Sequence, residues 1–316
     1  MSTLAEELER YVAIRRSLGY ELVEAARTLK RFVAFANAQG VDHITTDLFL
    51  RWKDVFGSAG TCTWAERLAI VRLFAQWRQG IDPRTEVPPK SLIPRGSYRR
   101  TRPYIYSEQE IASIIAEAAR LPSLGGIRSL TYTTLFGLIA VTGLRVSEAI
   151  ALDNNDVDVD GNVLTIRRGK FGKQRIVPIA KSTMGRLIAY AKERDRLLGG
   201  TPKPFFVTEH GTRAGNYSAR YAFATVCQRI GLRPAQKFNR HGRGPRLHDL
   251  RHTFAARTMI DWYNTGKDPE REMIKLSTYL GHSEPEHTYW YIEAIPELLE
   301  LASQRAERSL AWEDSR

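Results

Sequence analysis

The stretch LHDLRHTFAAR, residues 247–257, has the apolar spacing of an α-helix together with a pair of basic side chains. At about 3.6 residues per turn, three apolar positions form one stripe: Leu247, Leu250 and Phe254. His248 and Arg251, three positions apart, share a neighbouring face, so the helix presents an imidazole beside a guanidinium. A lone histidine on a half-buried helix is usually structural, and His248 becomes a candidate for chemistry only because of motifs elsewhere in the chain.

A second motif, TGLRVSE at residues 142–148, supplies another guanidinium. Arg145 lies at its centre, and Glu148 follows one helical turn later. Residues three apart on a helix are neighbours, so Glu148 can orient the Arg145 guanidinium or a nearby histidine; the alternative is an exposed ion pair. Guanidinium groups have the planar geometry that suits the two non-bridging oxygens of a phosphate.

A third motif, LGHS at residues 280–283, places His282 shortly before two tyrosines, Tyr289 and Tyr291. A histidine can donate a hydrogen bond to a phosphate. A tyrosine hydroxyl, with a free pKa of about 10, can act as a nucleophile where cations or a base activate it. Two arginines, two histidines and a tyrosine in such settings suit an attack on a phosphodiester.

Alternating apolar and polar residues predict a β-hairpin. Its strands are residues 162–168 and 174–179, and its tip is GKFGK at residues 169–173, which carries Lys170 and Lys173. The tip is glycine-rich and basic, but it lacks the G-x-x-x-x-G-K-[ST] pattern of a P-loop.

The sequence indicates no metal and no other cofactor. The segment DVDVDG at residues 156–161 imitates the opening of a calcium loop, but the twelfth position, which needs Glu, is Arg167. No acidic cluster suits a pair of metal ions. Cys62 and Cys227 are isolated, and we expect both to be buried free thiols.

Together these motifs resemble the catalytic signature of the tyrosine recombinases, the phage integrase family. The resemblance is close over residues 104–295 and only general in the N-terminal third. It implies one active site whose members, in the family's order, are Arg145, Lys170, His248, Arg251, His282 and Tyr291. The interval between Arg251 and His282 is longer than in many members of the family, which implies an extra turn and leaves the motifs intact.

The resemblance also implies the role of each residue. Lys170 matches the general acid that protonates the leaving 5′ oxygen, and His248 matches its acid/base partner. Tyr291 lies nine residues after His282, the family's usual spacing, and is expected to form a 3′-phosphotyrosine. Tyr289 is expected to be a packing aromatic.

Composition favours a polyanionic partner. Lys and Arg number 47 against 35 Asp and Glu, for a net charge of +12 and a pI near 9.8. Nucleic acid is the first candidate and an anionic membrane the second. No apolar run approaches the ~20 residues of a membrane-spanning helix, and the acidic N-terminus is unlike a signal peptide. We expect a cytoplasmic, nucleoid-associated protein.

Three segments are expected along the chain. Residues 1–87 read as a four-helix DNA-binding (core-binding) domain with an aromatic core. Gly19 is expected to separate the first two helices, and Thr45 or Thr46 to cap the third. A capping box at residues 63–66 is expected to begin the fourth. Residues 88–106 read as a basic, proline-rich linker, and residues 107–316 as the catalytic domain, beginning with a capping box at Ser107 and ending in a helix over residues 296–311.

Basic residues outside the catalytic set are expected to bind the DNA backbone. The candidates are Lys90, Arg95, Arg99, Arg100 and Arg102 in the linker, Lys173 in the hairpin tip, and Arg240, Arg243 and Arg246 before the central helix. The alternatives are a merely solvated charge run in the linker and a disordered surface loop before the helix.

The fold class that follows is mainly α with a small β-hairpin or sheet: a helical core-binding domain and a mixed α/β catalytic domain that clamp duplex DNA. The expected function is site-specific recombination on paired half-sites by four protomers, either identical or with related recombinases. A non-catalytic DNA-binding regulator and a type IB topoisomerase are the alternatives.

Overall fold

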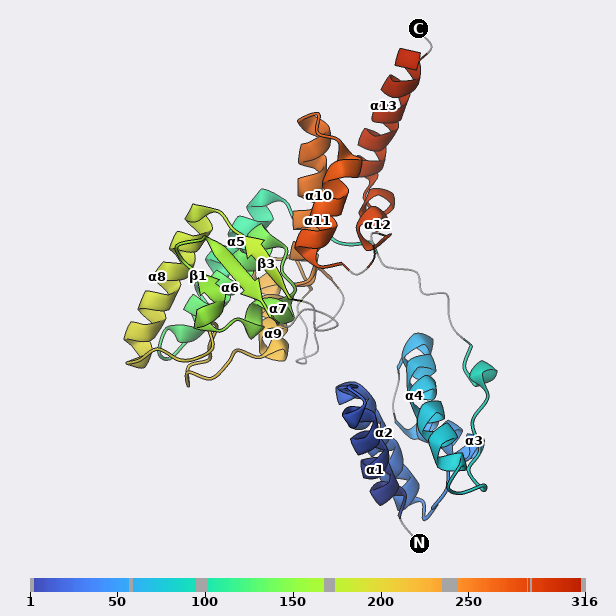
Figure 1. Ribbon diagram of the computed structural model, residues 1–316. Coiled ribbons are helices and arrows are strands. Elements are labelled where there is room, and N and C mark those ends of the chain that lie inside the picture. The colour runs from blue at the N-terminus through green and yellow to red at the C-terminus, as the bar shows by residue number, and fades with distance from the viewer. Residues whose placement is uncertain are drawn as a thin grey trace. The chain divides into compact units, whose positions relative to one another are not determined.

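The structure is a computed structural model that describes residues 3–56, 59–94, 102–167, 174–234, 244–282, 284 and 286–313 (Figure 1). The chain separates into two compact units, Met1–Thr101 and Arg102–Arg316. The division falls within the basic segment 88–106. Ile93 of this segment is buried in the core of the first unit, and Tyr106 is buried in the core of the second.

The described part of the first unit contains four α-helices and a short 3-10 helix: α1 (Leu4–Ser17), α2 (Val23–Ala38), α3 (Thr46–Val55), α4 (Thr61–Gln79) and η1 (Lys90–Leu92). Gly19, with φ 88°, follows the end of α1, and the Thr45 side chain caps α3, as predicted. The aromatic core is also confirmed, since Phe49, Trp52 and Phe74 are buried.

Two predictions for α4 are wrong. The helix begins at Thr61 after Gly60, so Thr63 lies inside the first turn and does not cap it. Nothing at Thr61 or Cys62 blocks helical geometry, and the helix therefore begins three residues earlier than predicted. Cys62, in this first turn, is exposed and not buried as expected, whereas Cys227 is buried as expected.

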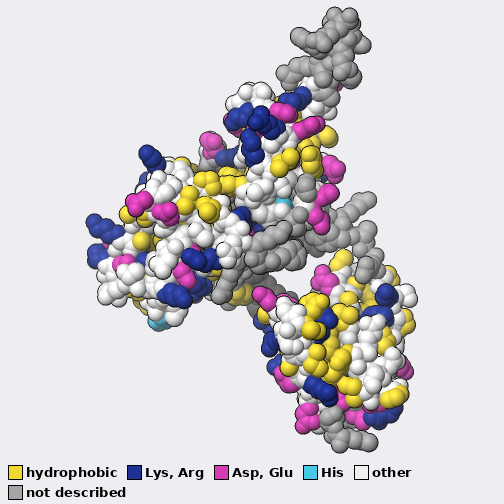
Figure 2. Space-filling view, in the orientation of Figure 1, with side chains coloured by type: hydrophobic (Ala, Val, Ile, Leu, Met, Phe, Trp, Pro, Cys, Tyr) yellow, Lys and Arg dark blue, Asp and Glu magenta, His cyan; other side chains and the backbone are white. Residues whose placement is uncertain are grey.

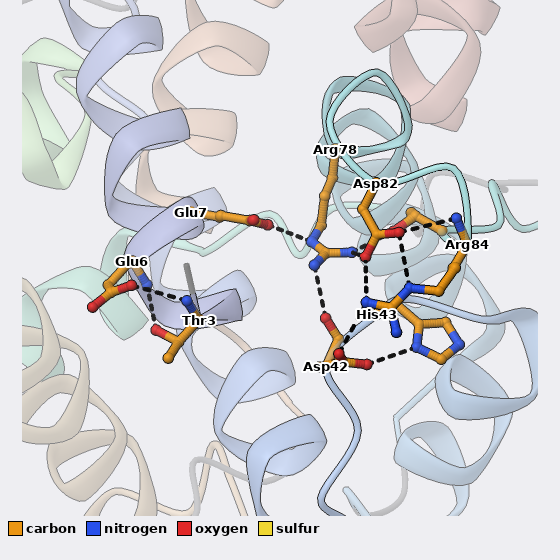
Figure 3. A network of polar contacts seen from close by, with 9 residues as sticks. Thr3, Glu6, Glu7, Asp42, His43, Arg78, Asp82 and Arg84 are labelled. Carbon is orange, nitrogen blue, oxygen red and sulfur yellow. Dashed lines mark hydrogen bonds and ion pairs between the residues drawn. The ribbon is translucent and has the colours of Figure 1, made fainter. Parts of the chain in front are cut away.

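A buried arginine ties the first unit together (Figure 3). The Arg78 side chain on α4 donates to Glu7 of α1 at 2.5 Å, to Asp82 at 3.2 Å and to the carbonyl oxygen of Asp42 at 2.7 Å. Arg84 bridges Asp42 and Asp82 at the exposed edge of this network. Because a buried charge is stable only when it is paired, these contacts hold together α1, α4, the loop between α2 and α3 and the loop after α4.

The second unit is mainly helical and includes a small sheet. Its helices are α5 (Glu108–Ala118), α6 (Ile127–Thr142), α7 (Val146–Ala151), η2 (Asn154–Asp156), α8 (Lys181–Leu198), α9 (Asn216–Arg229), α10 (Asp249–Asn264), α11 (Pro269–Leu280), α12 (Glu286–Ala294) and α13 (Pro296–Glu313). Its strands are β1 (Val157–Asp158), β2 (Val163–Ile166) and β3 (Arg175–Pro178). The capping box at Ser107 is confirmed.

The three described strands form an antiparallel sheet in the order β1-β2-β3. The pairing of the two predicted strands is confirmed, with Val163 opposite Pro178 and Ile166 opposite Arg175, while the predicted tip, residues 169–173, lies outside the described residues. The segment that imitates a calcium loop forms η2 and β1 instead, and Arg167 pairs with Asp156.

Helix α10 belongs to two cores at once. Leu247, just before it, and Leu250 pack in a core with α5, α6, α9 and the sheet. Met259 and Trp262 pack in a second core with α11, α12 and α13, which also holds Tyr291. The first residues of α10 therefore lie where the two cores meet. Of the C-terminal helix, Leu298 is buried in this second core and Leu299 is exposed.

The end of the basic segment is fastened to α10. The Tyr106 backbone N–H donates to Thr253 Oγ1 at 3.0 Å, and the Tyr106 hydroxyl donates to the Arg246 carbonyl at 3.0 Å. Arg257 donates to the Tyr106 carbonyl at 2.9 Å. Among the described residues, no helix is both long and apolar enough to cross a membrane.

Candidate active site

Arg251 is held inside the second unit by two backbone carbonyls. Its side chain, 2% exposed, donates to the carbonyl oxygen of Gly143 at 2.7 Å and to that of Leu280 at 2.8 Å. Gly143 ends α6 with φ 62°, and a Cβ there would lie 2.5 Å from Phe254 on α10. A glycine is therefore required where this loop meets α10.

Arg145 lies beside Arg251 because the two bind consecutive carbonyls. Arg145 caps the N-terminus of α7 and donates from Nη2 to the carbonyl of Gly281 at 2.9 Å, next to the Leu280 carbonyl that Arg251 binds. Burial, and then the charge of Arg145, lower the pKa of Arg251 to about 10. Two adjacent guanidiniums make a strongly cationic site.

Glu148 holds the Arg145 guanidinium and is not an exposed ion pair. Its side chain is 1% exposed, and it accepts from Arg145 Nη1 at 2.8 Å and from the Arg145 backbone N–H at 3.0 Å. It also accepts two bonds from Arg175, at 3.0 and 2.8 Å. Burial alone would raise the pKa of Glu148, but the bonds and charges of Arg175 and Arg145 outweigh it and lower the pKa to about 2.

Arg175, on β3, was not singled out from the sequence. Besides binding Glu148, its Nε donates to the carbonyl of Tyr279 near the end of α11 at 2.8 Å. A Cβ on Gly281, which has φ 67°, would lie 2.8 Å from Arg175 Nη1. The available signal was the position of Arg175 just after the basic hairpin tip, but a single arginine in a strand has no motif to distinguish it.

His282 follows Gly281, the C-cap residue of α11. Its Nδ1 is 2.7 Å from the Thr288 hydroxyl, and Thr288 is fully buried on α12. This bond fixes the imidazole next to the carbonyls that hold the two guanidiniums.

Tyr291 is a buried residue of α12 with its hydroxyl 2.8 Å from Nδ1 of His252. Tyr289, two residues earlier on the helix, points elsewhere and is 44% exposed. The prediction that Tyr289 packs is therefore wrong, because a helical segment separates the directions of residues two apart.

His252 is the second residue that sequence reasoning missed. Its ring packs edge-on against His248, with centroids 4.8 Å apart, and against Trp290. Burial, and then the neighbouring His248, lower the pKa of His252 to about 3. Its position directly after Arg251 was visible in the sequence, but consecutive residues of a helix point about 100° apart, so helical spacing did not connect His252 with the face that carries His248 and Arg251.

His248 lies at the start of α10, in the N-cap position. The residue keeps an exposed surface, while its ring packs on that of His252. Desolvation of the ring, and then the charge of Arg251, lower the pKa of His248 to about 4. The imidazole is neutral at neutral pH.

Of the remaining predicted residues, Arg246 lies just before α10, close enough to His248 and His252 to lower the pKa of both, and the others are exposed or lie outside the described residues. Arg246 is exposed and pairs with Asp249 at 2.9 Å, and Lys90 and Arg102 are exposed. Outside the described residues lie Lys170, Lys173, Arg95, Arg99, Arg100, Arg240 and Arg243. Within the described part of the chain, no group of three His, Cys, Asp or Glu residues could hold a metal ion.

Acid should destabilise the protein through His252. In the unfolded chain His252 binds a proton below its ordinary pKa of 6.5, whereas in the folded chain it does so only near pH 3. Between these two values the unfolded chain binds more protons, so the free energy of unfolding falls as the pH falls. The expected loss from this residue is up to about 2 kcal/mol at pH 5. Urea unfolding of the wild type and of His252→Asn at pH 7 and pH 5 measures it; equal losses in the two proteins would refute this assignment.

The fold and the site define a class of protein. A mainly helical unit that brings two guanidiniums, several imidazoles and a buried tyrosine together has the equipment of a tyrosine recombinase. The family model described as "Phage integrase family" matches residues 105–297, and the chain belongs to that family.

Relatives support the same identification over the whole length. The chain is 42% identical to a protein of Sinorhizobium fredii named as an integrase/recombinase, y4rB, over 99% of both chains. It is 26% identical to the tyrosine recombinase XerC of Corynebacterium glutamicum, over 80% of this chain and 75% of the relative.

The fold is shared with a recombinase solved on DNA. The XerH site-specific recombinase in a post-cleavage complex with a palindromic difH substrate matches with a TM-score of 0.59 and 18% identity, over 89% of this chain and 78% of that one. The chain is accordingly a site-specific tyrosine recombinase, an enzyme whose partner is DNA.

Proposed function

We propose that the chain cuts DNA by attack of the Tyr291 hydroxyl on a phosphodiester and holds the cut strand as a 3′-phosphotyrosine. The bond between this hydroxyl and His252 carries the proposal, because His252 directly follows Arg251 in α10. Arg251 and Arg145 in turn bind adjacent carbonyls at the end of α11. The nucleophile and two phosphate-binding groups thus belong to one network of contacts.

The proposed reaction is a transesterification. The Tyr291 oxygen forms a bond to phosphorus, the bond from phosphorus to the 5′ oxygen breaks, and the phenolic proton passes to a neutral imidazole of the site. The departing 5′ oxygen takes a proton, for which we propose Lys170. Attack by the 5′ hydroxyl of another strand reverses these steps and joins new partners, because the tyrosyl ester conserves the energy of the broken bond.

We assign the other residues by their charge and position. Arg145 and Arg251 stabilise the negative charge that develops on the non-bridging oxygens, and His282 donates a further hydrogen bond to them. His248 acts as the acid/base partner in proton transfer, since a neutral imidazole can both accept and donate. Glu148 keeps the Arg145 guanidinium in place.

Covalent capture tests the proposed function. We would incubate the protein in EDTA with a pool of random-sequence DNA duplexes, denature it in SDS, and map the adducted residue by mass spectrometry. The expected result is a DNA 3′ end on Tyr291, formed without divalent metal because the charge comes from side chains. An adduct on another residue, no adduct, or one that requires metal would contradict the mechanism.

We also propose that basic residues outside the site bind the DNA backbone. Lys90, Arg102 and Arg246 are exposed among the described residues. The same role is proposed for Arg95, Arg99, Arg100, Lys173, Arg240 and Arg243. On the face shown in Figure 2, basic and acidic side chains are interspersed over both units. Duplex binding should weaken with a slope of about 0.9 log units per phosphate contact as salt rises, and an affinity independent of salt would exclude such contacts.

The number of protomers in the recombining complex follows from the number of tyrosine nucleophiles that the reaction needs. Exchange between two duplexes needs four strand cleavages, and each chain carries one Tyr291. We therefore propose four protomers, identical or with related recombinases, on paired half-sites. Native mass spectrometry of the protein on paired duplex sites measures the number of protomers bound. Four protomers are expected, and a complex of only two would contradict the proposal.

A further inference from the structure

His252 lies on α10, directly after Arg251, and its ring contacts α12, the helix that carries the tyrosine. Its Nδ1 is 2.8 Å from the Tyr291 hydroxyl, and its half-buried ring packs against His248 on one side and Trp290 on another. The imidazole is therefore fixed by α10 and α12 together. None of the roles assigned above uses it.

We propose that His252 orients the nucleophile: its Nδ1 accepts the hydrogen bond of the Tyr291 hydroxyl and turns the oxygen lone pairs toward the phosphate. The proposal rests on Tyr291 being the nucleophile. A phenol attacks phosphorus through a lone pair, so its proton must point away from the reacting phosphate. A fixed acceptor beside the oxygen selects this arrangement before DNA is cut.

The surroundings of His252 keep it an acceptor. The groups that disfavour its protonated form are His248, Arg246, Arg251 and His282, which reach it from α10, from the residues before α10 and from the end of α11. An imidazolium at this place would carry a proton on Nδ1 and could only donate to the tyrosine oxygen, blocking a lone pair. Burial, together with the neighbouring imidazoles and the charges of Arg246 and Arg251, keeps the ring neutral, so that Nδ1 can accept.

The burial of Tyr291 limits what else can accept the hydrogen bond of its hydroxyl. The side chain is only 2% exposed, so water cannot readily replace His252 as the acceptor for the hydroxyl. Removing the acceptor leaves the hydroxyl to turn toward other groups, including the bound phosphate itself.

A nearly isosteric pair of variants tests the role. His252→Asn keeps a carbonyl oxygen that can accept from the hydroxyl, whereas His252→Leu has a similar shape and no acceptor. The probe is a nicked duplex of the sequence that the wild type captures from the random pool. At saturating protein, single-turnover formation of the Tyr291 adduct should be about 100-fold slower in His252→Leu than in His252→Asn, the cost of a misplaced reacting group.

The ratio of the adduct-formation rates of His252→Asn and His252→Leu tests whether His252 orients the nucleophile. Both variants lose the imidazole packing, so any general loss of stability affects both, and urea unfolding with DNA-binding titrations confirms that they are matched. Equal adduct rates in the two variants would overturn the proposal. Failure of the proposed function is distinguishable, since the wild type would then form no adduct at Tyr291 at all.

Discussion

Tyr291→Phe is expected to abolish the covalent protein–DNA adduct while leaving DNA binding nearly unchanged. The substitution removes one hydroxyl, and with it the atom that would bond to phosphorus. The ring still fills its place in the core of α10 to α13. His252 loses a buried hydrogen-bond partner, so the free energy of unfolding should fall by about 1–3 kcal/mol. Gel analysis in SDS measures the adduct, and urea unfolding measures the stability.

Tyr289→Phe is the matched control, because it removes the same atom two residues away on the same helix. Tyr289 is 44% exposed, so the change should affect neither the adduct nor the stability. An adduct that persists in Tyr291→Phe and disappears in Tyr289→Phe would transfer the role of nucleophile to Tyr289.

Glu148→Gln should destabilise the protein by about 3 kcal/mol or more and slow cleavage at saturating DNA. The carboxylate is 1% exposed and is shared by Arg145 and Arg175. Gln keeps the shape but removes the charge, which leaves two guanidiniums close together without their counter-ion. Arg145 is then held less firmly where the phosphate must bind. Urea unfolding and single-turnover adduct formation measure the two effects.

Glu193→Gln provides a surface control for this prediction. Glu193 and Arg196 are also three residues apart on a helix, but their side chains are 44% and 66% exposed. An exposed pair of this kind contributes at most about 1 kcal/mol. If Glu148→Gln were as mild as Glu193→Gln in both assays, Glu148 would have no special part in holding Arg145.

The sequence by itself determined the class of the fold and named most residues of the candidate site. Helical spacing and caps predicted most of the helices, and alternation predicted the strands of the hairpin, because these patterns depend on neighbours along the chain. The ordered motifs around Arg145, Arg251, His282 and Tyr291 indicated chemistry on a phosphodiester, because the chemical types of these side chains limit the reactions that they can catalyse.

Only the tertiary structure decided which side chains touch. Arg175 reaches Glu148 because β3 lies beside the end of α11, and His252 reaches Tyr291 because α10 lies between two cores and α12 packs against it. Local spacing carries no information on such contacts between distant segments. For the same reason the burial of Glu148 could not be read from an i,i+3 pattern that also fits an exposed ion pair.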